Sequence, residues 1–333
     1  MTRILAYVTG IYPYSRNHSL AARKWGRKAI TREELFQIKE ADSQRFVAKQ
    51  TELGLDYISD GQFMWMDYAR PFALSNKDVE EENLEMMRKS DTNTFIRRPK
   101  LDRLEDLANT DLSKFMMLDV EKRSLKVYGP YTFANLAVTK DRLEDVMSSY
   151  SQALANSLKG VKASLIEIAE PMLTEKTPEK DVIEHLKSCI GTITNRLDAE
   201  TNLSAPFNPI RHVWKDLLEF PVKGITVDMR ARDYFNIIPE AEKIVEDHIF
   251  MFGYDIQKTL VLGCVNGRNG GFTPDKGLET GEWIVDVVNL VRDKTETQLG
   301  VTFSTDEVIV PRAVADKKLE AIARAKRLLG GLT

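Results

Sequence analysis

The stretch "LKVYGPYTFANLAVTKDRLEDVMSSYSQALANSLKGVKASLIEIAEP", residues 125–171, decides the fold because it contains one complete strand–helix–strand unit. Its two ends, 125–130 and 164–171, are short apolar runs that stop at Gly-Pro and Glu-Pro, as buried strands do. Between them, 141–160 has a helical pattern that ends at Gly160. Two strands joined through a helix form a parallel pair with a crossover connection. The stretch therefore predicts a parallel α/β sheet.

The same alternation recurs along the whole chain. Eight strands are expected, at 4–10, 55–61, 125–130, 164–171, 196–204, 224–229, 259–265 and 307–312. The fifth of these runs is more polar than a core strand of a parallel sheet usually is. Eight such units favour a single closed (β/α)₈ TIM barrel, with a doubly wound sheet as the alternative.

Helical patterns separate these strands. The pattern at 31–54 begins with Thr31 and Glu34 at capping-box spacing and ends at Gly54. The other helices are expected at 141–160, 179–197, 231–253, 280–300 and 315–331.

One segment interrupts the alternation. Residues 66–122 lie between the second and third expected strands and include a charge-rich run. We expect this segment to be a partly helical insertion over one mouth of the barrel, within a single domain that spans residues 1–333.

Composition limits the class of protein. The chain has 333 residues, 43% of them hydrophobic, and a formal net charge of −3, so no global basic field suggests a nucleic-acid partner. No apolar run approaches the roughly 18 residues that a membrane span needs. The N-terminal run predicts a first strand rather than a signal peptide. With only two distant cysteines, Cys189 and Cys264, the simplest expectation is a reducing cytoplasm.

Polar and aromatic side chains follow nearly every expected strand. In a barrel of this kind, binding and catalysis take place at the carboxyl ends of the strands, so this clustering predicts a site at that mouth. Each residue also has an ordinary structural interpretation: Glu170 before Pro171 would anchor a turn, Trp65 would pack in the core, and Asp228 with Arg230 would form a structural pair. The residues after the strands include Arg16, Asp60, Gln62, Trp65, Asp67, Glu170, Asp228, Asn266, Arg268 and Asn269.

The run "LVLGCVNGRNGGF", residues 260–272, is the most unusual of these strand ends. Four glycines surround Asn266, Arg268 and Asn269, and glycine loses more entropy on ordering than any other residue. Loops after the seventh and eighth strands of such barrels often bind anions. A flexible connection is the alternative interpretation of this loop.

A metal site is a weak prediction from these residues. His185 and Cys189 have the i, i+4 spacing that zinc ligands can use, but they fall on a crossover helix and no further ligands converge with them. No Ser/His/Asp or Cys/His arrangement is apparent.

Several motifs together resemble the cobalamin-independent methionine synthases, whose chain contains two barrels. The resemblance is to the N-terminal, zinc-free barrel and runs from about residue 4 to 330. The motifs that carry it are "TREEL" at 31–35, "GLDYISDGQFMWMD" at 54–67, "GPYT" at 129–132, "PVKGITVDM" at 221–229 and "GCVNGRN" at 263–269.

The zinc-bearing barrel of that family fits less well. It would have His-x-Cys after the fifth strand, Glu after the sixth and Cys after the eighth. This chain has Asn202 and Ser204, then Asp228, then Ala313 at those positions. Ala169 also replaces an Asp that helps the zinc barrel to hold the amino group of homocysteine.

The resemblance implies an accessory role. The chain would help to bind a polyanionic, methyl-folate-like donor, while a separate zinc-bearing methionine synthase barrel transfers the methyl group to homocysteine. The zinc would belong to that partner, and this chain alone would bind no cofactor and would not be active. Arg16, Arg23 and Lys24 would meet the glutamate tail of the donor, together with the strand-end residues given above.

Two alternatives stay open. The chain could be an independent, metal-free barrel enzyme, decarboxylase- or lyase-like, that uses Asp60, Asp228 or Glu170 as an acid or base. It could also be a structural barrel without a ligand.

Overall fold

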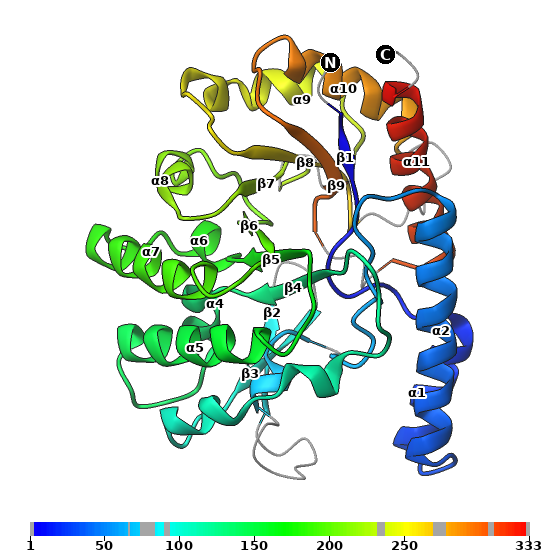
Figure 1. Cartoon of the computed structure of the whole chain (residues 1–333), viewed down its shortest axis with the longest axis vertical. Coiled ribbons are helices and arrows are strands. Elements are labelled where there is room, and N and C mark those ends of the chain that lie inside the picture. Colours follow the sequence, from blue (N-terminus) through cyan, green and yellow to red (C-terminus); the bar gives the residue numbers. More distant parts are fainter. Residues whose placement is uncertain are drawn as a thin grey trace.

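A parallel, curved sheet forms the centre of the molecule, with helices around its outer side (Figure 1). The computed structural model describes residues 3–65, 67–73, 84–89, 94–231, 237–268, 278–305 and 310–330. Seven strands pair in the order β1-β9-β8-β7-β6-β5-β4, and every neighbouring pair is parallel. The strands are β1 (Leu5–Ala6), β4 (Ser124–Tyr128), β5 (Leu165–Ala169), β6 (Glu200–Ser204), β7 (Gly224–Asp228), β8 (Thr259–Val265) and β9 (Leu299–Phe303). The predicted parallel α/β class is therefore confirmed.

The second expected strand, 55–61, does not form a strand. Its backbone nevertheless meets both edges of the sheet: the Asp56 N–H donates to Ala6 O at 2.9 Å, and Ile58 forms a single parallel bridge with Arg123 beside β4. Side chains take the place of a ladder here, since the Asp56 carboxylate accepts the Ala6 N–H at 2.8 Å. The described sheet has seven strands, and the closed eight-stranded barrel stays a prediction.

The last strand of the sheet lies earlier than expected. The helical pattern at 280–300 contains α10 only as far as Arg292, and β9 follows at Leu299–Phe303, in a position that we expected to be helical. The polar run after Arg292 is compatible with a helix, so the sequence pattern did not reveal that α10 ends there. The expected strand at 307–312 is wrong at its last residue, because Arg312 is the first residue of α11 (Arg312–Gly330). The carbonyl oxygen of Pro311 accepts the first helical hydrogen bond, from the Ala315 N–H. Residues 306–309 lie outside the described part.

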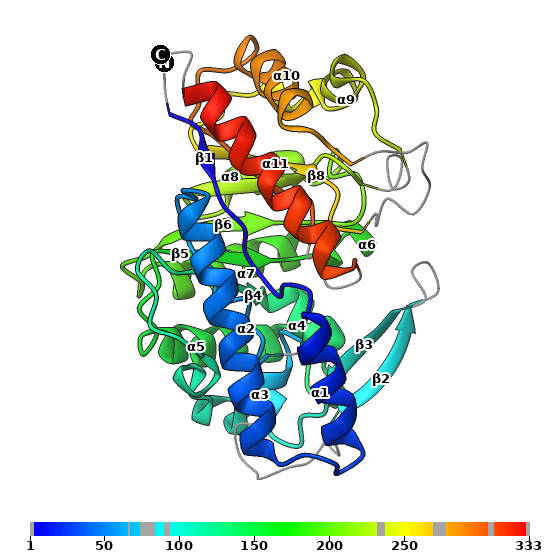
Figure 2. The same cartoon turned by 90° about the vertical axis from the view of Figure 1, so that its right-hand side faces the viewer.

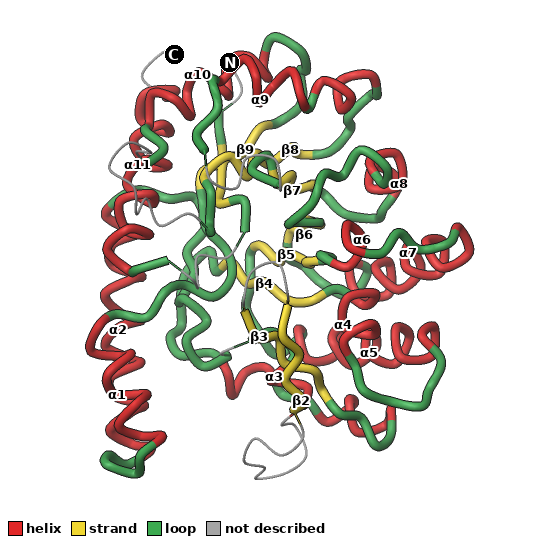
Figure 3. The backbone as a smooth tube through the Cα atoms, turned by 180° about the vertical axis from the view of Figure 1, so that it is seen from behind, coloured by secondary structure: helices red, strands yellow, loops and turns green. Residues whose placement is uncertain are grey.

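The helices cover the outer side of the sheet (Figure 3). The expected helix at 231–253 is too long, because residues 237–240 are not helical and include Pro239. Four of the helices given below, α1, α4, α6 and α8, were not expected. The main helices are α1 (Arg16–Gly26), α2 (Arg32–Glu52), α4 (Pro130–Leu136), α5 (Leu143–Leu158), α6 (Met172–Glu175), α7 (Lys180–Thr194), α8 (Trp214–Glu219), α9 (Ala241–Asp247), α10 (Gly281–Arg292) and α11, with a 3₁₀ segment η4 (Ile249–Gly253) after α9.

The start of α2 follows from its sequence. The Thr31 hydroxyl accepts the Glu34 N–H at 3.1 Å, and the Glu34 carboxylate accepts the Thr31 N–H at 2.7 Å, which is the predicted capping box. α1 and α2 form an antiparallel pair, lie side by side and extend below the sheet (Figure 2).

The predicted insertion at 66–122 contains more strand than expected. Its described helical parts are α3 (Arg70–Ala73) and the 3₁₀ segments η1 (Leu104–Asn109) and η2 (Leu112–Phe115), as a partly helical segment would have. The antiparallel hairpin of β2 (Leu84–Lys89) and β3 (Thr94–Pro99) was not expected. Among the described helices, none is long and apolar enough to span a bilayer.

The two faces of the sheet differ in chemistry. Leu125, Val127 and Ile168 belong to the large apolar core that the sheet shares with its helices. The opposite face is largely polar: Lys126, Glu167 and Asn202 share one register across β4, β5 and β6, and all three are buried. A polar layer of this kind inside a sheet must satisfy its own hydrogen bonds.

Candidate functional site

The carboxyl end of β5 holds a completely buried candidate residue, Glu170. Its Oε1 accepts the Tyr131 N–H at 2.9 Å, and its Oε2 accepts the Thr132 N–H at 2.7 Å, both from the first turn of α4. Gly129 makes this possible, since a Cβ at that position would collide with the carboxylate. Burial raises the pKa of Glu170 to about 7, although the two N–H donors act in the opposite direction. The carboxyl group therefore has a pKa near neutral pH, but both of its oxygens accept hydrogen bonds from the backbone of its own chain.

The carboxyl ends of β7 and β8 bring three candidate residues together. Arg268 donates from Nη2 to Asp228 Oδ2 at 3.3 Å and to Arg230 O at 2.6 Å. Its own N–H donates to Asn266 Oδ1 at 2.8 Å, so the Asn266 side chain shapes the turn that carries Arg268. The guanidinium also lies over the ring of Phe207, 5.6 Å from its centroid.

Asp228 joins this cluster to the loop after β6. Its Oδ2 accepts the Phe207 N–H and its Oδ1 accepts the Arg230 N–H, each at 2.9 Å. Burial raises the pKa of Asp228, and the charge of Arg268 opposes that effect. The predicted Asp228–Arg230 relation is therefore a contact to the backbone, while the charge pair forms with Arg268.

Behind these residues lies a second buried group of charges that the sequence analysis did not single out. Glu279 pairs with Arg230 at 2.7 Å and with Lys318 at 3.5 Å, and its Oε1 accepts the Asn266 N–H. Lys318 also donates to the carbonyl of Asn266. The signal for Lys318 was present in the sequence, because it occupies a core-facing position of α11 among apolar neighbours. Glu279 precedes the helix cap and has no comparable signal.

The residues after 55–58 form a separate group. Asp60 Oδ2 pairs with Arg123 Nη1 at 3.2 Å, and Asp60 Oδ1 accepts the Gln62 N–H at 2.9 Å. The Gln62 amide donates to Lys126 O and accepts the Lys126 N–H, in place of a strand peptide. Asp60 and Gln62 are therefore held within the chain at this edge of the sheet.

Trp65 and Asp67 follow the same segment. Trp65 is completely buried and packs edge-on against Tyr68 and Phe115, as its core interpretation requires. Asp67 Oδ1 accepts the N–H groups of Ala69 and Arg70 at the start of α3. The geometry gives both residues structural contacts, and their ligand-binding role stays a prediction.

The three predicted tail-binding residues lie on α1. Arg16, Arg23 and Lys24 are all exposed. Ser15 caps this helix by accepting the His18 N–H. The remaining candidate, Asn269, lies outside the described residues.

The donor set at the strand ends does not suit zinc. Asn202 donates to the Tyr7 hydroxyl and Ser204 donates to Glu167, while both oxygens of Asp228 accept N–H groups. Ala313 lies in the first turn of α11. Burial raises the pKa of the Cys264 thiol to about 12, which disfavours the thiolate that binds metal. Over the described ranges, no three His, Cys, Asp or Glu side chains gather where they could share an ion.

Curated relatives of the chain are methyltransferases. The enzyme named 5-methyltetrahydropteroyltriglutamate–homocysteine methyltransferase from Bacillus cytotoxicus is 25% identical over 352 residues, covering 91% of this chain and 44% of that protein. Its counterpart from Bacillus cereus is 24% identical and covers 90% and 43%. The chain thus spans less than half the length of these relatives.

Two solved structures share the fold. A B12-independent methionine synthase from Shewanella sp., solved in complex with selenomethionine, superposes with a TM-score of 0.69 over 91% of each chain at 14% identity. A putative vitamin-B12 independent methionine synthase from Listeria monocytogenes gives 0.63 over 98% of this chain and 99% of that chain, at 13% identity. At these identities the likeness concerns the fold alone.

A family model decides the relationship. The model of the cobalamin-independent synthase, N-terminal domain, matches residues 68–271, which is more than half of the chain and includes the strands from β4 to β8. This match confirms the resemblance that the motifs indicated, and the chain belongs to the family of the cobalamin-independent synthase N-terminal domain.

Proposed function

We propose that this chain is the donor-binding half of a cobalamin-independent methionine synthase and works with a separate zinc-bearing barrel. The observation that carries the proposal is the match to the N-terminal domain of that family over residues 68–271. The curated relatives that contain a whole enzyme are about twice as long as this chain and are named as homocysteine methyltransferases. In this proposal, the partner polypeptide carries out the second half of the reaction.

The chemistry divides naturally between the two halves. Methyl transfer to homocysteine needs a thiolate, which a zinc ion provides by lowering the pKa of the thiol. The residues at the strand ends of this chain do not form a soft donor set. The zinc chemistry is therefore not assigned to these residues. The partner would hold the zinc and the homocysteine.

The part left to this chain is binding of the methyl donor. A 5-methyltetrahydropteroyltriglutamate carries several carboxylates, and Arg16, Arg23 and Lys24 are exposed cations on one short helix. Each exposed pair contributes roughly 0.2–1 kcal/mol, so the three side chains would steer and orient the tail rather than bind it tightly. The Asp228–Arg268–Asn266 cluster is buried, so it would hold the loops beside the donor in place rather than contact the donor broadly.

The independent-enzyme alternative gains no specific support from the site. Glu170 has a pKa suited to acid–base chemistry, but it is fully buried and both of its oxygens accept backbone N–H groups. A general acid or base must reach the proton that it transfers. The accessory function is therefore the better supported of the two.

The test is reconstitution. We expect no methionine formation from 5-methyltetrahydropteroyltriglutamate and homocysteine by the purified chain, and formation when a separately produced zinc-bearing half is added. Activity of the purified chain without a second protein would contradict the proposal. Failure of every zinc-bearing half to gain activity from this chain, although each binds homocysteine, would contradict it as well.

A further inference from the structure

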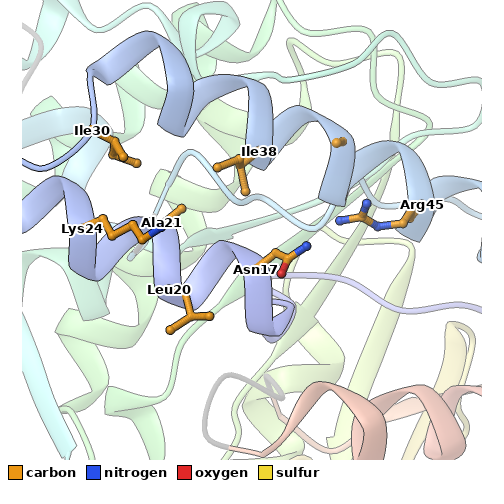
Figure 4. Close-up of a pocket in the computed structure, with 8 residues that line it drawn as sticks. Asn17, Leu20, Ala21, Lys24, Ile30, Ile38 and Arg45 are labelled. Carbon is orange, nitrogen blue, oxygen red and sulfur yellow. The ribbon is translucent and has the colours of Figure 1, made fainter.

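The helical hairpin of α1 and α2 has an open apolar groove between its two helices. Figure 4 shows that Ile38 points from α2 toward α1, on the side where Ala21 faces α2. The groove has a volume of about 280 Å³, below the range of roughly 300–1,000 Å³ that is typical of small-molecule pockets. Its lining residues are Asn17, Leu20, Ala21, Lys24, Ile30, Ile38, Ala41 and Arg45.

Large apolar side chains are exposed on α1, the helix that forms one wall of this groove. Leu20, which lines the groove, is 45% exposed, and Trp25 on the same helix is 42% exposed, although both are residues that normally pack in a core. Clustered exposed apolar residues of this kind usually mark an interaction surface rather than scattered surface variation.

The border of the groove carries mostly basic side chains, with Glu34 of α2 as an acidic group that interacts with Lys24. Residues 16–32 contain six basic residues and no acidic one: Arg16, Arg23, Lys24, Arg27, Lys28 and Arg32. All six are exposed. Two of the eight lining residues, Lys24 and Arg45, are cationic, and none is acidic. Arg45 contacts the buried Asp42 at 3.5 Å, yet its side chain stays 57% exposed and available at the rim.

We infer that this groove is a docking site for an amphipathic helix of a protein partner, with apolar residues on one face and acidic residues beside them. A furrow between two helices accepts the apolar side chains that a third helix presents at i, i+3 or i+4, and i+7. The acidic flanks would meet the cationic rim, which favours this partner over a basic or neutral one.

The shape separates this occupant from other anions. A glutamate tail can pair with the cations of α1, as proposed above, but it has no apolar face and would leave the groove residues Leu20 and Ile38 without an apolar partner. An anionic membrane would meet a convex apolar face better than a furrow. The inference goes beyond the proposed function and stands without it, since it requires only a helix-bearing protein.

The experiment uses synthetic peptides and the full chain. A fluorescein-labelled peptide of about 18 residues, or five helical turns, carries leucines at helical spacing and glutamates on both flanks. Two control peptides are a scrambled version and a version with lysine in place of glutamate. Fluorescence anisotropy should show binding of the acidic amphipathic peptide at least tenfold tighter than of either control.

A pair of matched variants tests whether the peptide binds at the groove. Leu20→Asp should weaken peptide binding at least tenfold, whereas Leu328→Asp, on a 38% exposed leucine of α11, should leave it unchanged. Circular dichroism checks that both variants are folded. Because neither leucine has a role in donor binding, a failed reconstitution of methyl transfer and a failed peptide test remain distinguishable.

Three results would overturn the inference. The first is an acidic peptide that binds no better than its controls, or a Leu20→Asp variant that binds it as well as wild type. The second is oligoglutamate of equal charge that binds as tightly as the peptide, which would make the attraction purely electrostatic. The third is binding to phosphatidylglycerol vesicles without peptide binding, which would assign the surface to a membrane.

Discussion

Glu170 is a carboxyl group whose protonation depends on burial. Its pKa is raised to about 7, above the ordinary value of about 4.3, so the folded state favours the protonated form. A raised pKa contributes stability that is fully present below pH 4.3 and is lost as the pH rises through 7. The loss is on the order of 3 kcal/mol. This single side chain therefore makes the fold more stable in mild acid than at alkaline pH.

The Glu170→Gln variant isolates this effect. We expect the free energy of unfolding of wild type, relative to the variant, to fall between pH 5 and pH 8. The variant itself should be less stable by about 1–3 kcal/mol at pH 5, since its NH₂ group would face a backbone N–H of Tyr131 or Thr132. Urea unfolding at both pH values measures the difference. Parallel pH curves for the two proteins would show that Glu170 does not titrate in this range.

Gly129 provides a second prediction at the residue scale. Any Cβ at this position would overlap the Glu170 carboxylate, so Gly129→Ala should destabilise the fold by about 1–3 kcal/mol. Gly26→Ala is the matched control: it ends α1 with nothing near its added Cβ, and alanine there should be neutral or stabilising by up to about 1 kcal/mol. Thermal unfolding of the two variants compares them. Equal melting temperatures would refute the packing role of Gly129.

Single residues also show what the sequence could predict about the site. Glu170, Asp228 and Arg268 were found because a polar group directly after a buried strand must lie at the sheet edge. What each one binds depends on contacts that are remote in sequence, such as the 40-residue separation between Asp228 and Arg268. For the same reason Glu279 was missed, since nothing in its local sequence distinguishes it from a surface residue.

Strand register creates the polar layer inside the sheet. Lys126 on β4 and Glu167 on β5 are directly opposite in the ladder, and their charged atoms are 2.9 Å apart. Ser204 and Thr226 donate to the two oxygens of Glu167 at 3.2 and 3.1 Å. The pair is buried and fully hydrogen-bonded on its acidic side. Breaking such a pair by removing one partner leaves an uncompensated charge in the interior.

This arrangement predicts strong coupling between two adjacent strands. Lys126→Met should destabilise the protein by about 3–5 kcal/mol, because Glu167 would stay buried without its cation. Adding Glu167→Gln should recover part of that loss, since the amide is neutral and can still accept from Ser204 or Thr226. Chemical denaturation of wild type, both single variants and the double variant gives the coupling energy. Additive effects would mean that the two charges do not interact.

The elements that the sequence predicted well are those whose pattern is local. Strands β4, β5, β7 and β8 are short apolar runs between turn residues, and α2 has its capping box. The predicted strand at 55–61 was wrong because the side chains of Asp56 and Gln62 form hydrogen bonds in place of a strand ladder. An apolar pattern cannot reveal such side-chain bonds. β9 failed for another reason: its five residues follow a polar stretch that is equally compatible with continuation of α10.

At the scale of the whole molecule, charge is distributed unevenly even though the net charge is small. The six basic residues of 16–32 lie on one protruding hairpin (Figure 2). A second basic group, Lys159, Lys162 and Arg196, borders a groove of about 650 Å³ beside residues that precede β4, β5 and β6. The proposed donor site uses the first group and not the second. The two groups therefore offer the same charge change at two different places on the molecule.

This contrast yields the last prediction. Replacing Arg16, Arg23 and Lys24 together with glutamine removes three exposed attractions of roughly 0.2–1 kcal/mol each, so the Kd for 5-methyltetrahydropteroyltriglutamate should rise by roughly three- to hundredfold. Glutamine at Lys159, Lys162 and Arg196 should leave the Kd unchanged. Isothermal titration calorimetry at low and high salt measures both. Wild-type affinity should also fall with salt, because exposed charges more than about 10 Å apart are screened at 0.1 M ionic strength.

The control variant distinguishes binding of the tail at α1 from a general effect of total charge. A loss of affinity that is equal in both triple variants would reflect only the change in total charge, and the tail would then have no fixed place on α1. A loss confined to the first variant, and reduced at high salt, would require the carboxylates to lie beside that helix. Such a result would place the glutamate tail of the donor on α1, as the proposed function requires.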